Sequence, residues 1–431
     1  MNDFVEKFEN VVHITDWYIH PSCAVENRSY KTASTRKKVT TENGNQTVIL
    51  ENDAEHSDLA GEPIFGSINA EQFYTESFGC NDRLALQYGL LHRCYDAECI
   101  EAGLHIITNQ ISLVSGVVDF DMCFRNYMHM RTYENSQGTI KRCYLRNNSL
   151  AFSYVLKGLQ SKGFYEIYDV DFLNTPQVIK SIIQEITLDK RFYHAKMIER
   201  GKYLCVLSPE AAGLFVHECL GHFFEADYYS EHASSYLPIG ALVGERWLNI
   251  VDYGMITGSG YTPFDDEGTD AQKTFIIKEG KVNALLTDNM YAKLLGHNLS
   301  SGNSRAQYAS DENLIRMTTT YMEGGYNSKE DTISSIESGI YIEACKGAVL
   351  GRKFHLYPHR AYLIEHGKIG EPILVSDVSG EPIETIKNII AISDDLKIFN
   401  SIFGGCTKKN QKRLHVAYGG PHVVIQSMDV I

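Results

Sequence analysis

The sequence lacks the features that would place the chain in or across a membrane. No stretch approaches the ~18 consecutive uncharged apolar residues that a transmembrane helix needs. The first residues, MNDFVEKFENVVH, have no basic segment followed by an apolar core, so they do not form a typical signal peptide. We therefore expect a cytoplasmic protein with no membrane partner.

Regular cysteine spacing and excess positive charge are missing as well. The ten cysteines form no C-x-x-C pair, and in a cytoplasmic chain most of them are expected to be reduced and buried. The net charge of −14 disfavours nucleic acid as a main partner. What is present, 43% hydrophobic and 22% charged residues, is the composition of a globular protein with ample core material.

The 431 residues suffice for two or three domains, and their patterns predict an α+β fold. We expect an N-terminal α+β domain over residues 1–195 and a second, mainly β domain over residues 196–431. The expected elements of the first are a hairpin around Asn43-Gly44, partly helical periodicity over residues 71–107 and an amphipathic helix over 176–188. Those of the second include hairpins with turns at Glu279-Gly280 and His366-Gly367.

The residues with the clearest chemistry lie in the run SPEAAGLFVHECLGHFFEAD, residues 208–227. Here His217 and His222 bracket Glu218. Imidazole nitrogens bind zinc well, and a carboxylate beside them can take a proton from a metal-bound water. Three ionisable groups in so apolar a run are costly unless something binds them. The motif therefore predicts a metal site rather than a chance grouping in a buried helix.

The spacing of the two histidines constrains the local backbone. They are five residues apart, one more than in H-E-x-x-H, and on a straight helix this leaves their side chains about 140° apart. We expect the helix that begins at Ser208 and Pro209 to kink, bulge or end between them, with Gly221 as the permissive residue. Cys219 should face the core, and Gly213 should leave open space one turn below His217.

The third metal ligand is not fixed by this geometry. A catalytic zinc takes about three protein ligands and a water. Cys406, presented after two glycines in the C-terminal segment, and Glu225, three residues after His222, are the leading candidates. The remaining candidates are Asp227, Cys219 and histidines 297, 355, 359, 366, 415 and 422.

The second half of the chain closely resembles the TldD/PmbA family of metallopeptidases. The matching stretches occur in the family's order and cover about residues 200–431: VLSPEAAGLFVHECLGHFFEAD (206–227), FDDEGT (264–269), SGNSR (301–305), IRMTTT (315–320), the spaced G-K-x-x-x-P of 367–372, GGCTKKNQ (404–411) and GGPHVVI (419–425).

This resemblance implies an H-E-x-x-x-H zinc site, one Zn²⁺ per chain, held by His217, His222 and Cys406. It places Lys408 and Gln411 at the basic and amide positions of the C-terminal motif, whereas Thr407 stands where the family usually has glycine. It also implies a homodimer, or a heterodimer with a related subunit, and cleavage of extended peptides. Some family members mature modified peptides.

We therefore expect a zinc-dependent peptidase with Glu218 as the general base. A first alternative is a metal-dependent amidase of deformylase type, which the order of the cysteine and the H-E motif disfavours. A second is a non-enzymatic peptide-binding or assembly protein with a structural metal, for which a closed site of four protein ligands is expected.

Overall fold

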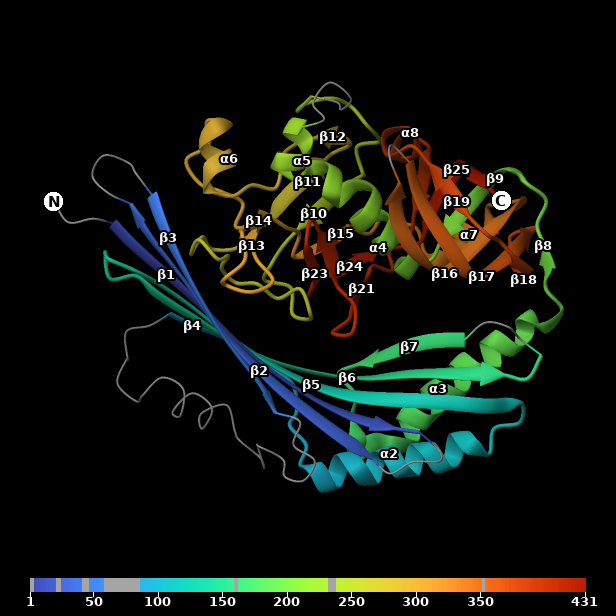
Figure 1. Ribbon diagram of the computed structural model, residues 1–431. Helices are drawn as coiled ribbons and strands as arrows, with labels where there is room; N and C mark the ends of the chain where they lie inside the picture. Colours follow the sequence, from blue (N-terminus) through green and yellow to red (C-terminus); the bar gives the residue numbers. More distant parts are fainter. Residues whose placement is uncertain are drawn as a thin grey trace.

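The computed structural model describes residues 4–20, 25–40, 46–57, 86–158, 162–231, 238–350 and 353–431, to which all structural statements below refer. It confirms the α+β class, with a strand-rich C-terminal part. Figure 1 shows the long strands of an N-terminal sheet crossing beneath the C-terminal half, with two helices on the sheet's opposite face.

The N-terminal sheet has seven strands in the order β3-β2-β1-β5-β6-β4, with β7 also paired to β6. The strands are β1 Phe4–Ile19, β2 Glu26–Thr40, β3 Gln46–Ser57, β4 Leu86–Leu91, β5 Val117–Asn135, β6 Ile140–Leu156 and β7 Lys162–Tyr168; the two covering helices are α2 Ala97–Ser112 and α3 Thr175–Lys190.

The two faces of this sheet have different roles because successive side chains of a strand alternate. On β5, Phe120 and Phe124 face the helices and join a buried apolar cluster with residues of α2 and α3, among them Leu104 and Ile182. The odd-numbered Arg131 points to the other face, where it forms an ion pair with Asp266 of the C-terminal half at 2.5 Å. The second face therefore contacts the region that carries the motif.

The C-terminal half contains two larger sheets and several short helices. In the first sheet, pairing of β16 with both β9 and β17 closes the strands β16-β9-β25-β19-β17 into a ring. Its members are β8 Lys196–Met197, β9 Gly201–Leu207, β16 Ser338–Leu350, β17 Lys353–Glu365, β18 Lys368–Leu374, β19 Val378–Gly380, β20 Ile389–Ile392 and β25 Val423–Val430.

The second sheet has the order β12-β11-β10-β15-β24-β21. Its strands are β10 Ile250–Asp252, β11 Thr274–Lys278, β12 Lys281–Val282, β15 Thr319–Met322, β21 Lys397–Asn400 and β24 Ala417–Gly420. Two strand pairs, β13 Ser304–Arg305 with β14 Leu314–Ile315 and β22 Cys406–Lys408 with β23 Gln411–Leu414, lie outside both sheets, and the helices here are α4 Pro209–Val216, α5 Ala226–Glu231, α6 Asn289–Leu294, α7 Lys329–Ser334 and α8 Pro382–Lys387. The helix α4 packs between the two sheets, against β16 and β24.

Several predicted elements are confirmed. Helix α3 covers the predicted 176–188, and both C-terminal hairpins form around turns whose two central residues have positive φ, as the Glu-Gly and His-Gly pairs suggest. In the N-terminal hairpin β2 pairs with β3, while the Asn43-Gly44 turn lies outside the described residues. The prediction of partly helical structure over 71–107 is wrong for residues 86–91, which form β4. Residues 71–85 lie outside the described part.

The division into two domains near residue 195 stays a prediction. Helix α3 ends at Lys190, and the next strand, β8, already pairs with β18 of the C-terminal half. Every cysteine among the described residues is free, and six of these eight are buried, whereas Cys23 and Cys80 lie outside the description. Within the described part of the chain, no helix combines the length and apolarity needed to span a membrane.

Candidate metal centre

The helix that carries the motif begins as its sequence predicts. Ser208 caps α4, with its hydroxyl accepting a hydrogen bond from the amide of Ala211, and Pro209 occupies the first turn. The α-helix ends at Val216 and continues as a π-helical turn over His217–Gly221, followed by a 3₁₀ turn over His222–Phe224. The wider π turn brings residues five apart onto one face, so the expected bulge between the histidines is confirmed.

Two glycines of this helix have a different role from the one predicted. Gly221 has ordinary right-handed helical angles (φ −54°, ψ −51°), so the turn does not depend on its backbone freedom. A Cβ there would instead lie 2.0 Å from the sulfur of Met317. The prediction of open space above Gly213 is also wrong, because a Cβ at that position would lie 2.7 Å from the Cα of Gly419. Both glycines allow close packing of the helix against its neighbours.

The structure brings His217, His222 and Cys406 together. One candidate ligand atom from each lies within 4.8 Å of the other two, and the Cys406 sulfur is 3.4 Å from Nε2 of His222. Cys406 arrives on the short hairpin β22–β23, whose register is irregular between Cys406 and Lys408. Thr407, where the resemblance implies glycine, lies at this irregularity and is exposed.

The charges of the three side chains stabilise one another. Burial alone would raise the pKa of the Cys406 thiol, but His222 and His217 outweigh burial and hold it well below its usual value. Burial would lower the pKa of His222, whereas Cys406 and Glu225 raise it well above its usual value. The Nδ1 atom of His217 is buried without a hydrogen-bond partner in the described structure. A thiolate and two imidazoles form a donor set that suits zinc, so the residues fit a divalent metal.

Glu225, the alternative third ligand, lies beside His222 rather than among the three clustered ligand atoms. Its buried carboxylate is 3.3 Å from Nδ1 of His222 and 2.8 Å from the ammonium of Lys408. Lys408 also contacts Asp227 at 2.7 Å. A carboxylate behind a ligating histidine fixes the ring's orientation and leaves the other nitrogen for a metal. Sequence spacing alone could not predict that Lys408 contacts both Glu225 and Asp227.

The remaining predicted residues take separate places. Glu218 is half-buried, and its side chain lies against Gly347 of β16, where a Cβ would come within 2.9 Å of its Cγ. Cys219 is fully buried in the core on the far side of the helix, as expected, and burial raises the pKa of its thiol. Among the distant histidines, His422 pairs with Asp395 and His355 with Asp377, each at 2.9 Å.

A residue that the motif search did not single out lies directly behind Cys406. Arg316 is completely buried, and one of its terminal nitrogens donates a 2.7 Å hydrogen bond to the carbonyl of Cys406. Its Nε and Nη1 atoms have no hydrogen-bond partner in the described structure. This arginine ties the β22–β23 hairpin to the segment that precedes β15.

Comparison with known sequences finds similarity to metallopeptidases. The PmbA/TldA metallopeptidase C-terminal domain matches residues 200–431. The chain is 33% identical over 234 residues to a zinc metalloprotease TldD homolog of Saccharolobus solfataricus, covering 53% of this chain and 52% of that protein. It is 32% identical over 232 residues to a metalloprotease of Methanothermobacter thermautotrophicus, covering 53% and 50%. The chain thus spans about half the length of these curated relatives.

Comparison with solved structures extends over the whole chain. A putative modulator of a DNA gyrase from Thermotoga maritima superposes with a TM-score of 0.70 at 15% identity, covering 100% of this chain and 96% of that one. TldE from Thermococcus kodakarensis superposes with a TM-score of 0.68 at 16% identity, covering 99% and 96%. At this identity the likeness shows the fold alone, and it includes the N-terminal half, which the family match does not cover.

Proposed function

The chain belongs to the PmbA/TldA metallopeptidase family, and from this premise we propose that it is a zinc-dependent peptidase that hydrolyses extended or unfolded peptides. One observation supports the proposal above all others. Two imidazoles and a thiol converge to within 4.8 Å, and Glu218 directly follows the first of the two histidines. The motif residues thus gather in one place although Cys406 is 184 residues from His222 in the sequence.

In the proposed site His217, His222 and Cys406 hold one zinc ion. When bound, zinc supplies Lewis acidity that polarises a carbonyl and lowers the pKa of a coordinated water. Glu225 orients His222 through Nδ1, and Arg316 holds the backbone of Cys406. The chain therefore provides both the donor atoms and the supports that keep them in position.

Glu218 takes the proton of the attacking water and delivers it to the leaving amine. The residue directly follows His217 on the π turn, and His222 begins the 3₁₀ turn that comes next. Such general-base catalysis typically contributes ~10²–10⁴-fold in rate. Packing against Gly347 limits the positions that the side chain can take.

The ligand count favours a catalytic over a structural metal. Among the described residues, the cluster contains three candidate ligands, whereas a closed structural site has four. The deformylase alternative requires the cysteine to precede the histidines in the chain, and here Cys406 follows them. Neither alternative has an observation in its favour.

The test is peptide cleavage followed by mass spectrometry with zinc-loaded protein. Glu218→Gln should retain its zinc and lose ~10²–10⁴-fold in cleavage rate, because the amide is nearly isosteric but cannot accept the proton. Glu231→Gln, the same change at an exposed position on α5, should cleave normally. Near-normal turnover by zinc-loaded Glu218→Gln would refute the assignment of the base.

Substrate state and assembly are part of the same proposal. If peptides bind as an added strand, backbone hydrogen bonds supply the affinity and sequence preference is weak. A sequence presented as a free peptide should then be cut while the same sequence inside a folded domain is spared. We also propose that the chain works as a dimer, with a second copy or a related subunit, which solution mass measurements on the purified protein and on copurified partners can distinguish.

A further inference from the structure

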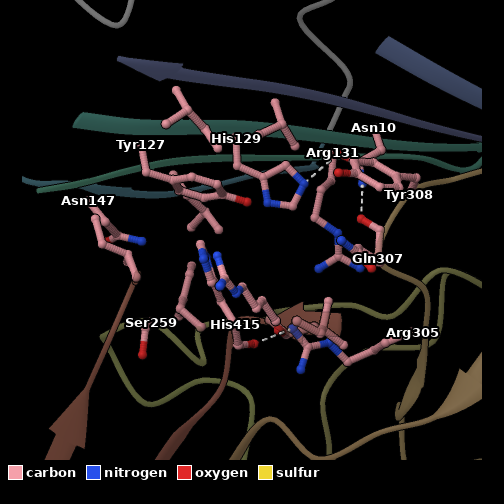
Figure 2. A pocket seen from close by; sticks show the side chains of 18 of the residues that line it. Asn10, Tyr127, His129, Arg131, Asn147, Ser259, Arg305, Gln307, Tyr308 and His415 are labelled. Atoms are coloured by element: carbon pink, nitrogen blue, oxygen red, sulfur yellow. Dashed lines mark hydrogen bonds between the residues drawn. The ribbon is translucent and has the colours of Figure 1, made fainter. Parts of the chain in front are cut away.

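A cavity of about 330 Å³ lies between the N-terminal sheet and segments of the C-terminal half, among them β13 and β23. Figure 2 shows Tyr127, His129 and Arg131 of β5 pointing into it from one side, with Arg305 and His415 on the other. The three β5 residues alternate along the strand, so they share one face of the sheet. The cavity is distinct from the metal cluster, whose three residues do not line it.

The lining of this cavity is rich in positive charge. It includes four arginines: Arg125, Arg131, Arg305 and Arg413. Two of them are neutralised by carboxylates. Arg125 makes a two-pronged pair with the buried Asp16, with both distances at 2.7 Å, and Arg131 pairs with Asp266.

Arg305 is not neutralised in this way. It is only 7% exposed, and its hydrogen bonds go to the backbone carbonyls of Met317 and His415. No carboxylate within the described residues forms an ion pair with it. Burial, together with Arg131 and Arg316, lowers the pKa of Arg305 to about 10, although Asp266 and Asp252 act in the opposite direction. A buried guanidinium without a directly paired carboxylate is costly, so an anion in the cavity would be stabilising.

Burial and the nearby arginines also lower the pKa values of the two histidines of the cavity. Burial, followed by Arg125 and Arg305, lowers the pKa of His415 to about 4. Burial, followed by Arg131, His415 and Arg305, lowers the pKa of His129 well below its usual value. Both rings are therefore neutral near pH 7 and act as hydrogen-bonding groups. The arginine cavity, as we call this space, keeps a surplus of positive charge from Arg305 and Arg413.

We propose that the arginine cavity binds a carboxylate of the peptide substrate, either an acidic side chain or the free C-terminus, with Arg305 as its principal counter-ion. This inference rests on the proposed peptidase function. The volume of the cavity accommodates a side chain or a chain end rather than a folded domain. Guanidinium groups pair well with planar carboxylates, and Asn147 and Gln307 at the lining can hydrogen-bond to peptide amides.

The position of the cavity favours a peptide over an unrelated small anion. Leu414 lines the cavity and pairs directly with Cys406 across the β22–β23 hairpin. Arg305 donates to the carbonyl of Met317, the residue next to Arg316, which in turn holds the carbonyl of Cys406. The cavity and the metal cluster thus share two backbone segments and are neighbours, as binding of one extended ligand to both requires.

The experiment measures binding without cleavage, on zinc-loaded protein carrying Glu218→Gln. Four acetylated ten-residue peptides of Ala, Ser and Gly are compared by calorimetry. They contain one central Glu or Gln and end in a free carboxylate or an amide. Replacing the preferred carboxylate with an amide should weaken binding by ~10- to 100-fold, the range for a hydrogen bond to a charged group. The Glu/Gln pair reports on a side chain, and the acid/amide pair reports on the C-terminus.

Variants then identify the counter-ion. Arg305→Gln should remove most of the discrimination between carboxylate and amide peptides, and Arg413→Gln, at an exposed position, should reduce it by a smaller factor. Arg246→Gln makes the same charge change at a side chain that is 89% exposed and does not line the cavity, so it should leave the discrimination intact.

Three results would overturn the inference: equal affinity for all four peptides, full discrimination in both Arg305→Gln and Arg413→Gln, or competition by inorganic phosphate as strong as that by the carboxylate peptides. The last would identify a site for small anions. Because binding is measured in a non-cleaving variant, absence of peptide cleavage by the wild-type protein would refute the proposed function without bearing on charge discrimination.

Discussion

The metal cluster and the arginine cavity are assembled in opposite ways. The cluster draws its three candidate ligands from one helical turn and one short hairpin of the C-terminal half. The cavity takes its lining from β1, β2, β5 and β6 of the N-terminal sheet and from β13, β23 and loops of the C-terminal half. The cluster can therefore form within one half of the chain, whereas the cavity exists only where the two halves meet.

The two sites also differ in how the charges of their side chains are balanced. In the cluster, the thiol of Cys406 and the carboxylate of Glu225 face His222, so opposite charges lie side by side. In the cavity, Arg305 is buried beside other arginines. Charge is thus balanced by the chain where a metal is proposed, and left unbalanced where a ligand is proposed.

The largest expected effect separates the two sites completely. Cys406→Ser should lose nearly all zinc and all cleavage, because a serine hydroxyl is a poor zinc ligand. The preference for carboxylate over amide peptides should survive in this variant, since none of the four cavity arginines is touched. Zinc content by atomic absorption and peptide binding by calorimetry measure the two effects.

The matched control for this change is Cys219→Ser on the same helix. It places a hydroxyl in the fully buried core and should cost about 1–3 kcal/mol of stability while zinc remains stoichiometric. Full zinc in Cys406→Ser together with loss of zinc in Glu225→Ala would instead make Glu225 the third ligand.

A smaller effect is expected from the carboxylate behind the cluster. Glu225→Gln should weaken zinc binding by ~10- to 100-fold without unfolding the protein, because residues that orient a ligating histidine contribute by about that factor. Competition with a chelator of known affinity measures it. Asp227→Asn removes the other carboxylate that contacts Lys408 but leaves the contact with His222, so its zinc affinity should change much less. Equal losses in both variants would assign the effect to Lys408.

How far the sequence predicts each site follows from this contrast. His217, Glu218 and His222 lie within six residues, so their chemistry and the need for a helical irregularity follow from helix geometry. Cys406 required resemblance to a family, because its spacing from the helix carries no geometric information. The hairpins followed from turn residues that accept positive φ, a local property.

The arginine cavity was not predictable from the same signals. Tyr127, His129 and Arg131 show alternation typical of any strand, and nothing local indicates that Arg305, far along the chain, lies opposite them. The close packing of Gly213 against β24 was missed for the same reason, because helix geometry describes the space above a residue but not which distant strand fills it.

The helix packing that positions the cluster can be tested at Gly213. Gly213→Ala places a methyl group 2.7 Å from a backbone atom of Gly419 that cannot move freely, so we expect a loss of about 3 kcal/mol, the upper part of the range for overpacking. Gly370→Ala, where the nearest atom is 3.7 Å away, should be nearly neutral. Urea unfolding of both variants compares them. Equal stability would mean that α4 can shift, and zinc affinity should then fall instead.

The smallest expected effect concerns Glu210, which begins the motif helix but lies close to charges of both halves. Burial, then Glu185 of α3, raises the pKa of Glu210 to about 7, with Glu343 adding to the rise and Arg360 of β17 opposing it. A carboxyl whose pKa is higher in the folded state stabilises the fold at low pH, where it is protonated in both states. That stability is lost as the pH rises from about 4.5, the ordinary value, to about 7.

Glu210→Gln removes this titration because the amide stays neutral. At ~1.4 kcal/mol per pKa unit the full shift corresponds to ~3.5 kcal/mol. Because the Glu210 side chain is partly exposed and screened by solvent, we expect the variant to gain about 1–2 kcal/mol of stability relative to the wild type between pH 5 and pH 8. Urea unfolding of both proteins at pH 5, 6, 7 and 8 measures the difference, in which other titrating groups cancel. A difference that is constant with pH would mean that the carboxylate is solvated or paired in the folded protein. Glu185 of α3 would then have no electrostatic influence on the start of α4, and the two halves would not be coupled at this point.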